Sequence, residues 1–90
     1  MHAVVVNLVI DDLKADLADL RGRVVPRISE APGFVTGYWT RKCTTGLSLI
    51  VFDSEDAANA GAERVRSVIP DVDAEATIEN IEAREVVAHA

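Results

Sequence analysis

The chain has 90 residues, a length that supports one domain but not two, because each of two would lack a hydrophobic core. Hydrophobic residues make up 49% of the sequence, which excludes an intrinsically disordered chain. The formal net charge is −6 and Lys and Arg do not cluster, so we expect neither nucleic-acid binding nor attachment to an anionic membrane. Cys43 is the only cysteine, and no basic leader precedes the first apolar stretch. We expect one cytoplasmic domain over residues 1–90.

Residues 3–10 are apolar and largely β-branched on both alternate faces, which is typical of a strand buried on two sides. Asp11 and Asp12 then offer carboxylates to a helix N-terminus. Apolar residues spaced three and four apart predict an amphipathic helix that runs to about residue 31. They are Leu13, Leu17, Leu20, Val24 and Ile28. Pro26 lacks a backbone N–H and is expected to kink the helix, which Pro32-Gly33 ends.

Residues 34–42 predict a second strand, in which Tyr38 and Trp39 point to opposite faces. Thr44-Thr45-Gly46 predicts a hairpin turn, with Gly46 able to adopt positive φ. Residues 47–52 then predict a third strand that is again apolar on both faces.

A second helix is predicted to begin after the run Asp53-Ser54-Glu55-Asp56, which supplies a cap and first-turn acids. We expect it to end near Ile69, because Pro70 does not readily continue a helix. Residues 75–88 hold the fourth strand. Its alternation slips between Ile78 and Ile81, which indicates a bulge.

The predicted order βαββαβ gives an α+β, ferredoxin-like fold, a four-stranded antiparallel sheet in the order 4-1-3-2 with both helices on one face. The two central strands of this order are the first and third, which are the strands that are apolar on both faces. Because two helices cover only one face, the other would expose a large apolar patch. We therefore expect a homodimer formed through the open sheet face.

Three motifs carry a resemblance to a known family: Ala31-Pro32-Gly33-Phe34, Gly37-Tyr38-Trp39, and the run from Val51 to Ala58. With them the chain resembles the antibiotic-biosynthesis-monooxygenase-like family of the dimeric α/β barrel superfamily. The resemblance covers nearly the whole chain and implies a dimeric α/β barrel. That family includes cofactor-free oxygenases of polycyclic quinols, haem-degrading enzymes and many small members without a known activity.

The family's quinol oxygenases hold their substrate with polar and aromatic residues in a cleft between helices and sheet. The resemblance therefore implies Asn7 and Trp39 as catalytic candidates and Tyr38 and Arg41 as ligand-binding candidates, with no cofactor and no metal. Haem-degrading members also use an Asn on the first strand, but they add a Trp and a His around the second helix. Residues 54–69 contain neither, which argues against ligation of haem iron.

Each candidate residue also has a structural explanation. Asn7 interrupts an apolar strand, and it either bonds a neighbouring polar group or points at a ligand, because a buried amide left unpaired costs about 1–3 kcal/mol. Trp39 and Tyr38 either pack at an interface or form a platform for a substrate. Arg41 is either a solvated edge charge or a partner for an anion. No two carboxylates stand out as an acid and a base.

Two functions from different classes stay open on this sequence. The first is a cofactor-independent monooxygenase-like protein that acts on an aromatic or quinol-like compound. The second is a non-catalytic dimeric module that binds a small ligand or a protein. The resemblance favours the enzyme, whereas the lack of an evident catalytic set favours the binding module.

Overall fold

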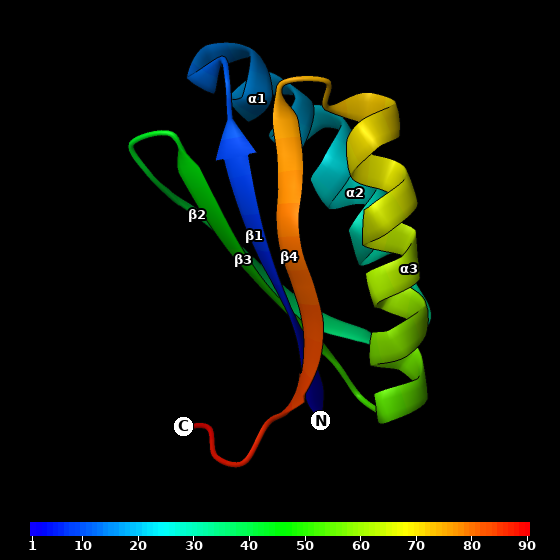
Figure 1. Ribbon diagram of the computed structural model, residues 1–90. Coiled ribbons are helices and arrows are strands. Elements are labelled where there is room, and N and C mark those ends of the chain that lie inside the picture. The colour runs from blue at the N-terminus through cyan, green and yellow to red at the C-terminus, as the bar shows by residue number, and fades with distance from the viewer.

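Four strands form one antiparallel sheet in the order β2-β3-β1-β4, in a computed structural model that describes residues 1–90 (Figure 1). The strands are β1 (His2–Ile10), β2 (Phe34–Lys42), β3 (Thr45–Phe52) and β4 (Ala76–Glu85). The helical segments are α1 (Leu13–Asp19), the π-helical η1 (Leu20–Val24), α2 (Val25–Ser29) and α3 (Glu55–Val72). They all lie on one face of the sheet (Figure 1). The ferredoxin-like fold and its predicted strand order are confirmed.

The alternation of β1 divides its side chains between a closed face and an open face of the sheet. Val4, Val6, Leu8 and Ile10 are buried against the helices. The intervening side chains lie on the other face and are only partly buried; they are Val5, Asn7 and Val9. The closed face meets Ile28 from α2, Val65 from α3 and Phe52 from β3 in one core cluster.

The first helix keeps its predicted apolar stripe but is built from three segments. The N–H of Val25 donates to the carbonyl of Leu20, five residues back, which is the π-helical pattern. Pro26 follows directly and has no N–H for the carbonyl four residues before it, so the turn widens there. The distortion expected at Pro26 is thus present, and it takes the form of η1.

The second helix of the prediction is α3 in the structure, and it is longer than predicted because it continues through Pro70 to Val72. The expectation that it ends near Ile69 was wrong. Pro70 lies in the last turn and removes only its own N–H, and the N–H of Asp73 still donates to the carbonyl of Ile69 at 2.9 Å. At the other end the Ser54 hydroxyl accepts from the N–H of Ala57, as a helix cap.

The hairpin between β2 and β3 is tighter than predicted. Lys42 pairs with Thr45, so the loop is Cys43-Thr44, and β3 begins at Thr45 rather than at residue 47. Cys43, and not Gly46, takes positive φ, at 53°. Gly46 instead lies inside β3 and is buried. The sequence pattern missed this because Cys is uncommon at positive φ.

The fourth strand has the irregularity that its sequence predicted. Its register against β1 shifts between Asn7 and Leu8, which face Asn80 and Ile78 and leave Glu79 as the extra residue. The strand spans Ala76–Glu85, so it ends three residues before the predicted end.

No helix of the protein has the length and apolar character needed to cross a membrane.

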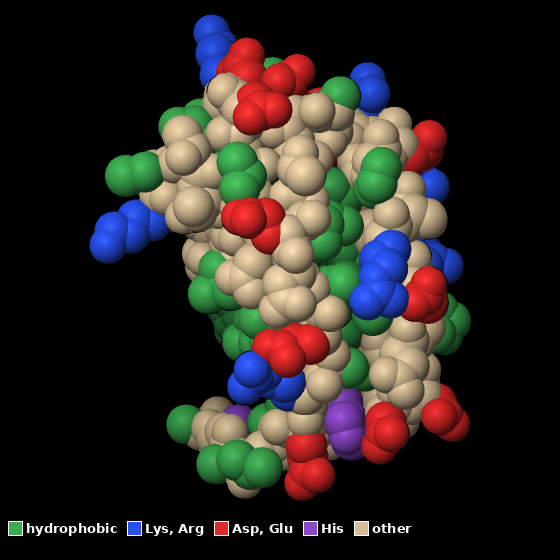
Figure 2. Space-filling model, in the orientation of Figure 1, with side chains coloured by type: hydrophobic (Ala, Val, Ile, Leu, Met, Phe, Trp, Pro, Cys, Tyr) green, Lys and Arg blue, Asp and Glu red, His purple; other side chains and the backbone are tan.

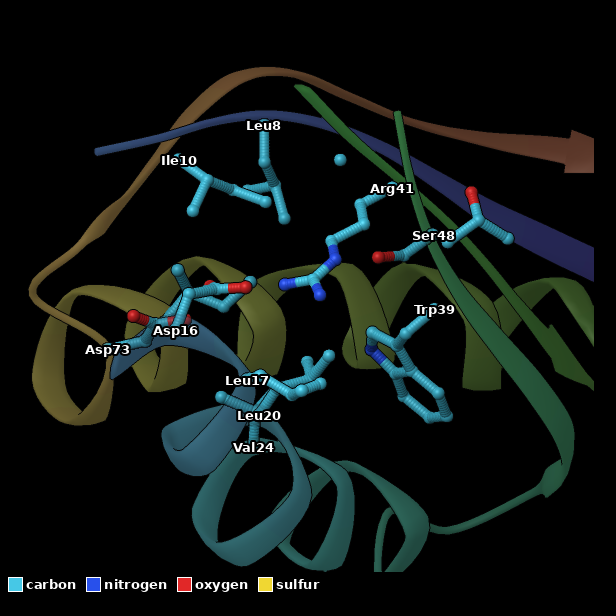
Figure 3. Close-up of a pocket in the computed structure, with 13 residues that line it drawn as sticks. Leu8, Ile10, Asp16, Leu17, Leu20, Val24, Trp39, Arg41, Ser48 and Asp73 are labelled. Atoms are coloured by element: carbon cyan, nitrogen blue, oxygen red, sulfur yellow. The ribbon is translucent and has the colours of Figure 1, made fainter. Parts of the chain in front are cut away.

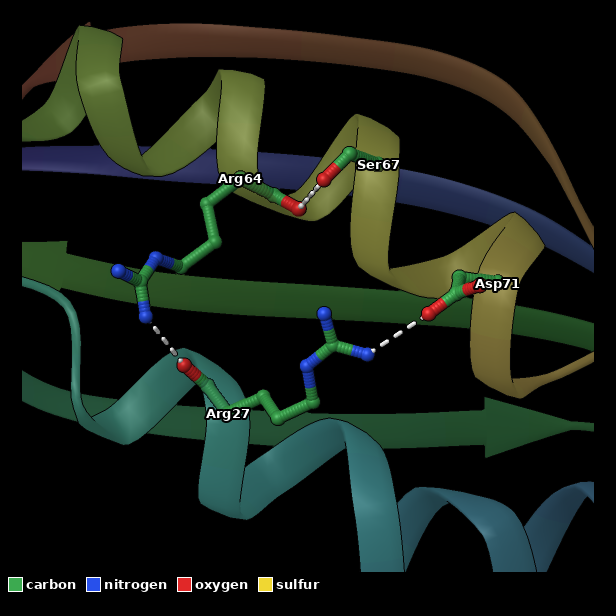
Figure 4. A network of polar contacts seen from close by, with 4 residues as sticks. All are labelled: Arg27, Arg64, Ser67 and Asp71. Carbon is green, nitrogen blue, oxygen red and sulfur yellow. Dashed lines mark hydrogen bonds and ion pairs between the residues drawn. The ribbon is translucent and has the colours of Figure 1, made fainter.

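A polar network joins α2 to α3 on the outside of the helix layer (Figure 4). Nη1 of Arg27 lies 2.9 Å from Oδ2 of Asp71, and Nη1 of Arg64 donates to the carbonyl of Arg27 at 2.9 Å. Because the ion pair is about half exposed, we expect it to contribute less than about 1 kcal/mol. Its role is to fix where α2 sits on α3.

Two helical glycines give a matched test of this packing. A Cβ at Gly61 would overlap the Phe52 ring, whereas a Cβ at Gly22 would meet nothing within 4 Å. We expect Gly61→Ala to lower the free energy of unfolding by about 1–3 kcal/mol through overpacking. Gly22→Ala should raise it by up to about 1 kcal/mol, because Ala has the better helix propensity. Urea unfolding measures both, and equal stability of Gly61→Ala and wild type would contradict the packing described.

Candidate functional site

A cavity of about 90 Å³ lies between the first helix and the closed face of the sheet (Figure 3). Leu8 and Ile10 from β1 form one wall, and Leu17, Leu20 and Val24 from α1 and η1 form the opposite wall. The apolar stripe predicted for the first helix therefore lines the cavity as well as the core. Polar side chains from α1, β2, β3 and the residue after α3 complete the lining. Among them are Asp16, Trp39, Arg41, Ser48 and Asp73.

Trp39 enters the cavity from β2 because strand alternation turns it toward the helices, where it packs against the core cluster. Gly37 lies two residues earlier on the same face. A Cβ at Gly37 would come within 2.6 Å of the indole Cη2 atom, so the glycine makes room for the ring to lie along the strand. The indole then borders the cavity (Figure 3).

Two carboxyl groups are buried at the end of the cavity formed by α1 and the C-terminus of α3. Asp16 is 3% exposed and Asp73 is 2% exposed. Burial is the largest effect on Asp73 and raises its pKa to about 7, helped by a hydrogen bond and charge repulsion from Asp16 and by the charge of Asp19. The N–H of Glu75, 3.3 Å from Oδ1 of Asp73, acts weakly in the opposite direction. Near neutral pH the carboxyl group of Asp73 is therefore protonated for part of the time.

Arg41 reaches over the cavity from the end of β2. Its Nη1 donates to the carbonyl of Leu13 at 3.0 Å, which ties β2 to the start of α1. Its guanidinium points into the space lined by the other side chains (Figure 3). Although Asp16 and Asp73 line the same cavity, Arg41 forms no ion pair with either of them. The site thus contains a positive charge and a carboxyl pair that do not neutralise each other.

The structure does not bring the four residues proposed from the sequence into one site, although Arg41 also lines a second hollow together with Asn7. Trp39 and Arg41 share the cavity. Asn7 lies on the open face, where it pairs with Leu47 of β3 and Asn80 of β4, and Tyr38 is 61% exposed on the same face beside Leu49. The idea that all four line one cleft is therefore not met. A functional role for Asn7 and Tyr38 stays a prediction.

Sequence reasoning missed the two carboxyl groups, and the expectation that no acid–base pair exists is corrected by their geometry. Asp16 carried a signal, since it lies three residues after Leu13 and four before Leu20, on the apolar face of the helix. Asp73 carried none once the helix was expected to end near Ile69. The continuation of α3 places Asp73 four residues after Ile69, on the buried side.

The chain offers no group of three or more His, Cys, Asp or Glu side chains that could hold a metal ion. The carboxyl pair can exchange a proton with a bound molecule, and Arg41 can donate hydrogen bonds to it. The arrangement is suited to an apolar molecule that carries an ionisable or hydrogen-bonding group.

Comparison with known proteins shows the fold. No protein-family model and no curated protein sequence matches the chain. Among solved structures, HapK from Hahella chejuensis has a TM-score of 0.72 at 12% identity, over 100% of this chain and 96% of its own. MupZ from Pseudomonas fluorescens has a TM-score of 0.69 at 13% identity over 91% of this chain, which spans 65% of MupZ.

A third similar structure is the monooxygenase from the gene ActVA-Orf6 of Streptomyces coelicolor, in complex with nanaomycin D. It has a TM-score of 0.60 at 19% identity, over 99% of this chain and 92% of its own. The chain therefore has the fold of antibiotic-biosynthesis-monooxygenase-like proteins, as its sequence motifs suggested.

The buried carboxyl pair predicts how stability depends on pH. Asp73 has its ordinary pKa of 3.8 when unfolded and about 7 when folded, so the folded chain binds more protons between these values. The free energy of unfolding should therefore fall as pH rises through this window, by up to about 1.4 kcal/mol per pH unit. Asp73→Asn should flatten this slope, whereas Asp11→Asn, an exposed control, should keep it. Urea unfolding at several pH values measures the slope, and equal slopes in both variants would contradict the shifted pKa.

Proposed function

We propose that the protein is a cofactor-independent oxygenase of a hydroxylated aromatic compound, with the cavity as its active site. The observation that carries the proposal is the buried Asp16–Asp73 pair, which borders an apolar cavity together with Trp39. A pKa near the working pH is what a general base requires. The fold gives further support, because similar structures include a monooxygenase.

The reaction needs only dioxygen as a second substrate. A phenol and O₂ give a quinone and water: the ring loses its hydroxyl proton and one ring hydrogen, one oxygen atom enters the ring, and the other leaves as water. With the pair fully ionised, Asp73 and Asp16 accept the hydroxyl proton. The resulting phenolate is electron-rich and transfers an electron to O₂. The radical pair then combines to a ring peroxide that loses water.

The remaining cavity residues position the ring and exclude water. Leu8, Leu17 and Leu20 provide apolar walls, which strengthen the electrostatic effect of the carboxyl pair by lowering the local dielectric. The indole of Trp39 offers an aromatic surface for an edge or offset contact with the substrate ring. The protein thus supplies a base, an orientation and a dry environment, and the substrate supplies the electrons.

This proposal predicts a dependence on Asp73 and on pH. Asp73→Asn should lower kcat about 10²- to 10⁴-fold, because an amide accepts no proton at this pH. The wild-type rate should rise with pH through about 7, as the carboxyl group of Asp73 loses its proton. An oxygen electrode with a panel of single-ring phenols measures the rate. Full activity of Asp73→Asn would refute the role of the base, and Asp11→Asn serves as the control.

The open face of the sheet supports a second proposal, a homodimer, which holds whether or not the protein is an enzyme. Tyr38, Leu47 and Leu49 are 61%, 48% and 40% exposed there, and Asn7 lies among them. Hydrophobic side chains gather along the side of the sheet that faces away from the helices (Figure 2). We propose that this face forms the contact between two copies of the chain. A non-catalytic dimeric module remains the alternative function.

The dimer proposal predicts a mass of twice 9.7 kDa by light scattering at micromolar concentration. Leu49→Glu should give the monomeric mass, because it places a charge at the centre of the contact. Ala60→Glu adds the same charge to an exposed position of α3 and should leave the dimer intact. A monomeric wild type would reject the dimer.

A further inference from the structure

We infer that the cavity selects a single-ring hydroxyarene that also carries an anionic group, such as a carboxylate. The ligand hydroxyl would meet the Asp16–Asp73 pair, the ring would lie against Trp39, and the anion would pair with Arg41. The inference rests on the proposed function only for the location of the site, because it concerns which molecule binds and not which reaction follows.

The size of the cavity limits the ligand to about one ring. Its volume of about 90 Å³ is well below the roughly 300–1,000 Å³ that holds drug-sized ligands. A cavity of about 150 Å³ is known to bind benzene. A single ring therefore already exceeds the present volume, and its entry requires the guanidinium of Arg41 to move outward from the carbonyl of Leu13. The walls are apolar apart from the two polar ends, so the body of the ligand is apolar as well.

The carboxyl end of the cavity suits a hydroxyl group and excludes an anion. A pair that shares one proton presents both a donor and an acceptor, and a hydroxyl group can satisfy both. A second negative charge at this end would be repelled by Asp16 and Asp73, and by Asp19, whose charge also reaches the pair. An anionic substituent must therefore point the other way.

Arg41 is the group that an anion meets at the other end. Its guanidinium has five N–H donors, of which one is used on the carbonyl of Leu13. No carboxylate of the protein pairs with it. A ligand carboxylate would give it the planar partner that a guanidinium binds with two hydrogen bonds. Because the protein carries a net charge of −6, this local positive charge is what makes an anionic ligand acceptable.

Binding can be followed directly through Trp39, the only tryptophan in the chain. Its fluorescence is titrated anaerobically at pH 6.5 with 4-hydroxybenzoate, 4-methylphenol and benzoate, and calorimetry repeats each titration. We expect 4-hydroxybenzoate to bind about 10-fold or more tightly than either single-function probe, since a charge-assisted hydrogen bond contributes about 1.5–3 kcal/mol. Asp73→Ala should remove the advantage over benzoate.

Arg41→Gln and Lys42→Gln form a matched pair, because each removes one positive charge from neighbouring residues whose side chains point to opposite faces of β2. We expect Arg41→Gln to weaken 4-hydroxybenzoate about 10-fold and to change 4-methylphenol less than about 2-fold. Lys42→Gln should change neither.

Three results would overturn the inference: equal affinity for 4-hydroxybenzoate and 4-methylphenol, equal weakening of both by Arg41→Gln, or no binding of any probe at millimolar concentration. Because oxygen is absent, these outcomes are distinct from failure of the proposed function. Selective binding without later oxygen uptake would reject the oxygenase and keep the ligand class. Oxygen uptake with neutral phenols, without a preference for the anionic compound, would keep the oxygenase and reject the ligand class.

Discussion

The burial of the Asp16 and Asp73 carboxyl groups beside each other is the constraint on which the proposed chemistry of this protein depends. Two ionised carboxylates buried side by side would repel each other in a medium that screens charge poorly. One proton relieves the repulsion, and the same burial raises the pKa of Asp73 to about 7. The arrangement lowers stability at neutral pH, and this cost is consistent with the binding or catalytic role that we propose for the cavity.

The fold explains why the cavity lies where it does. Strand alternation sends Trp39 and Arg41 to the helix side of β2, and the first helix brings Asp16 to them. α2 is fixed to α3 by the network around Arg27, whereas α1 precedes the π-helical segment and is tied to β2 through Arg41. The helix layer thus has polar contacts at both ends, and the cavity lies at the end formed by α1.

The sequence predicted the sheet order correctly because two-sided apolarity distinguishes central strands from edge strands. It also predicted the opposite directions of Tyr38 and Trp39, which follow from the strand period of two. It did not predict the face of Asn7. The alternation divides the residues of a strand between two faces, but it does not tell which face the helices cover. Asp73 was missed because a proline in the last turn of a helix removes only one hydrogen bond, and its effect on helix length depends on packing.

The most direct test of this account is a ¹³C NMR titration of the aspartate side-chain carboxyl carbons. We expect the carboxyl carbon of Asp73 to titrate near pH 7, because its carboxyl group is buried beside that of Asp16. If Asp73 instead titrates near its ordinary pKa of 3.8, its carboxyl group is fully ionised at neutral pH, and the proposed base with a pKa near the working pH does not exist.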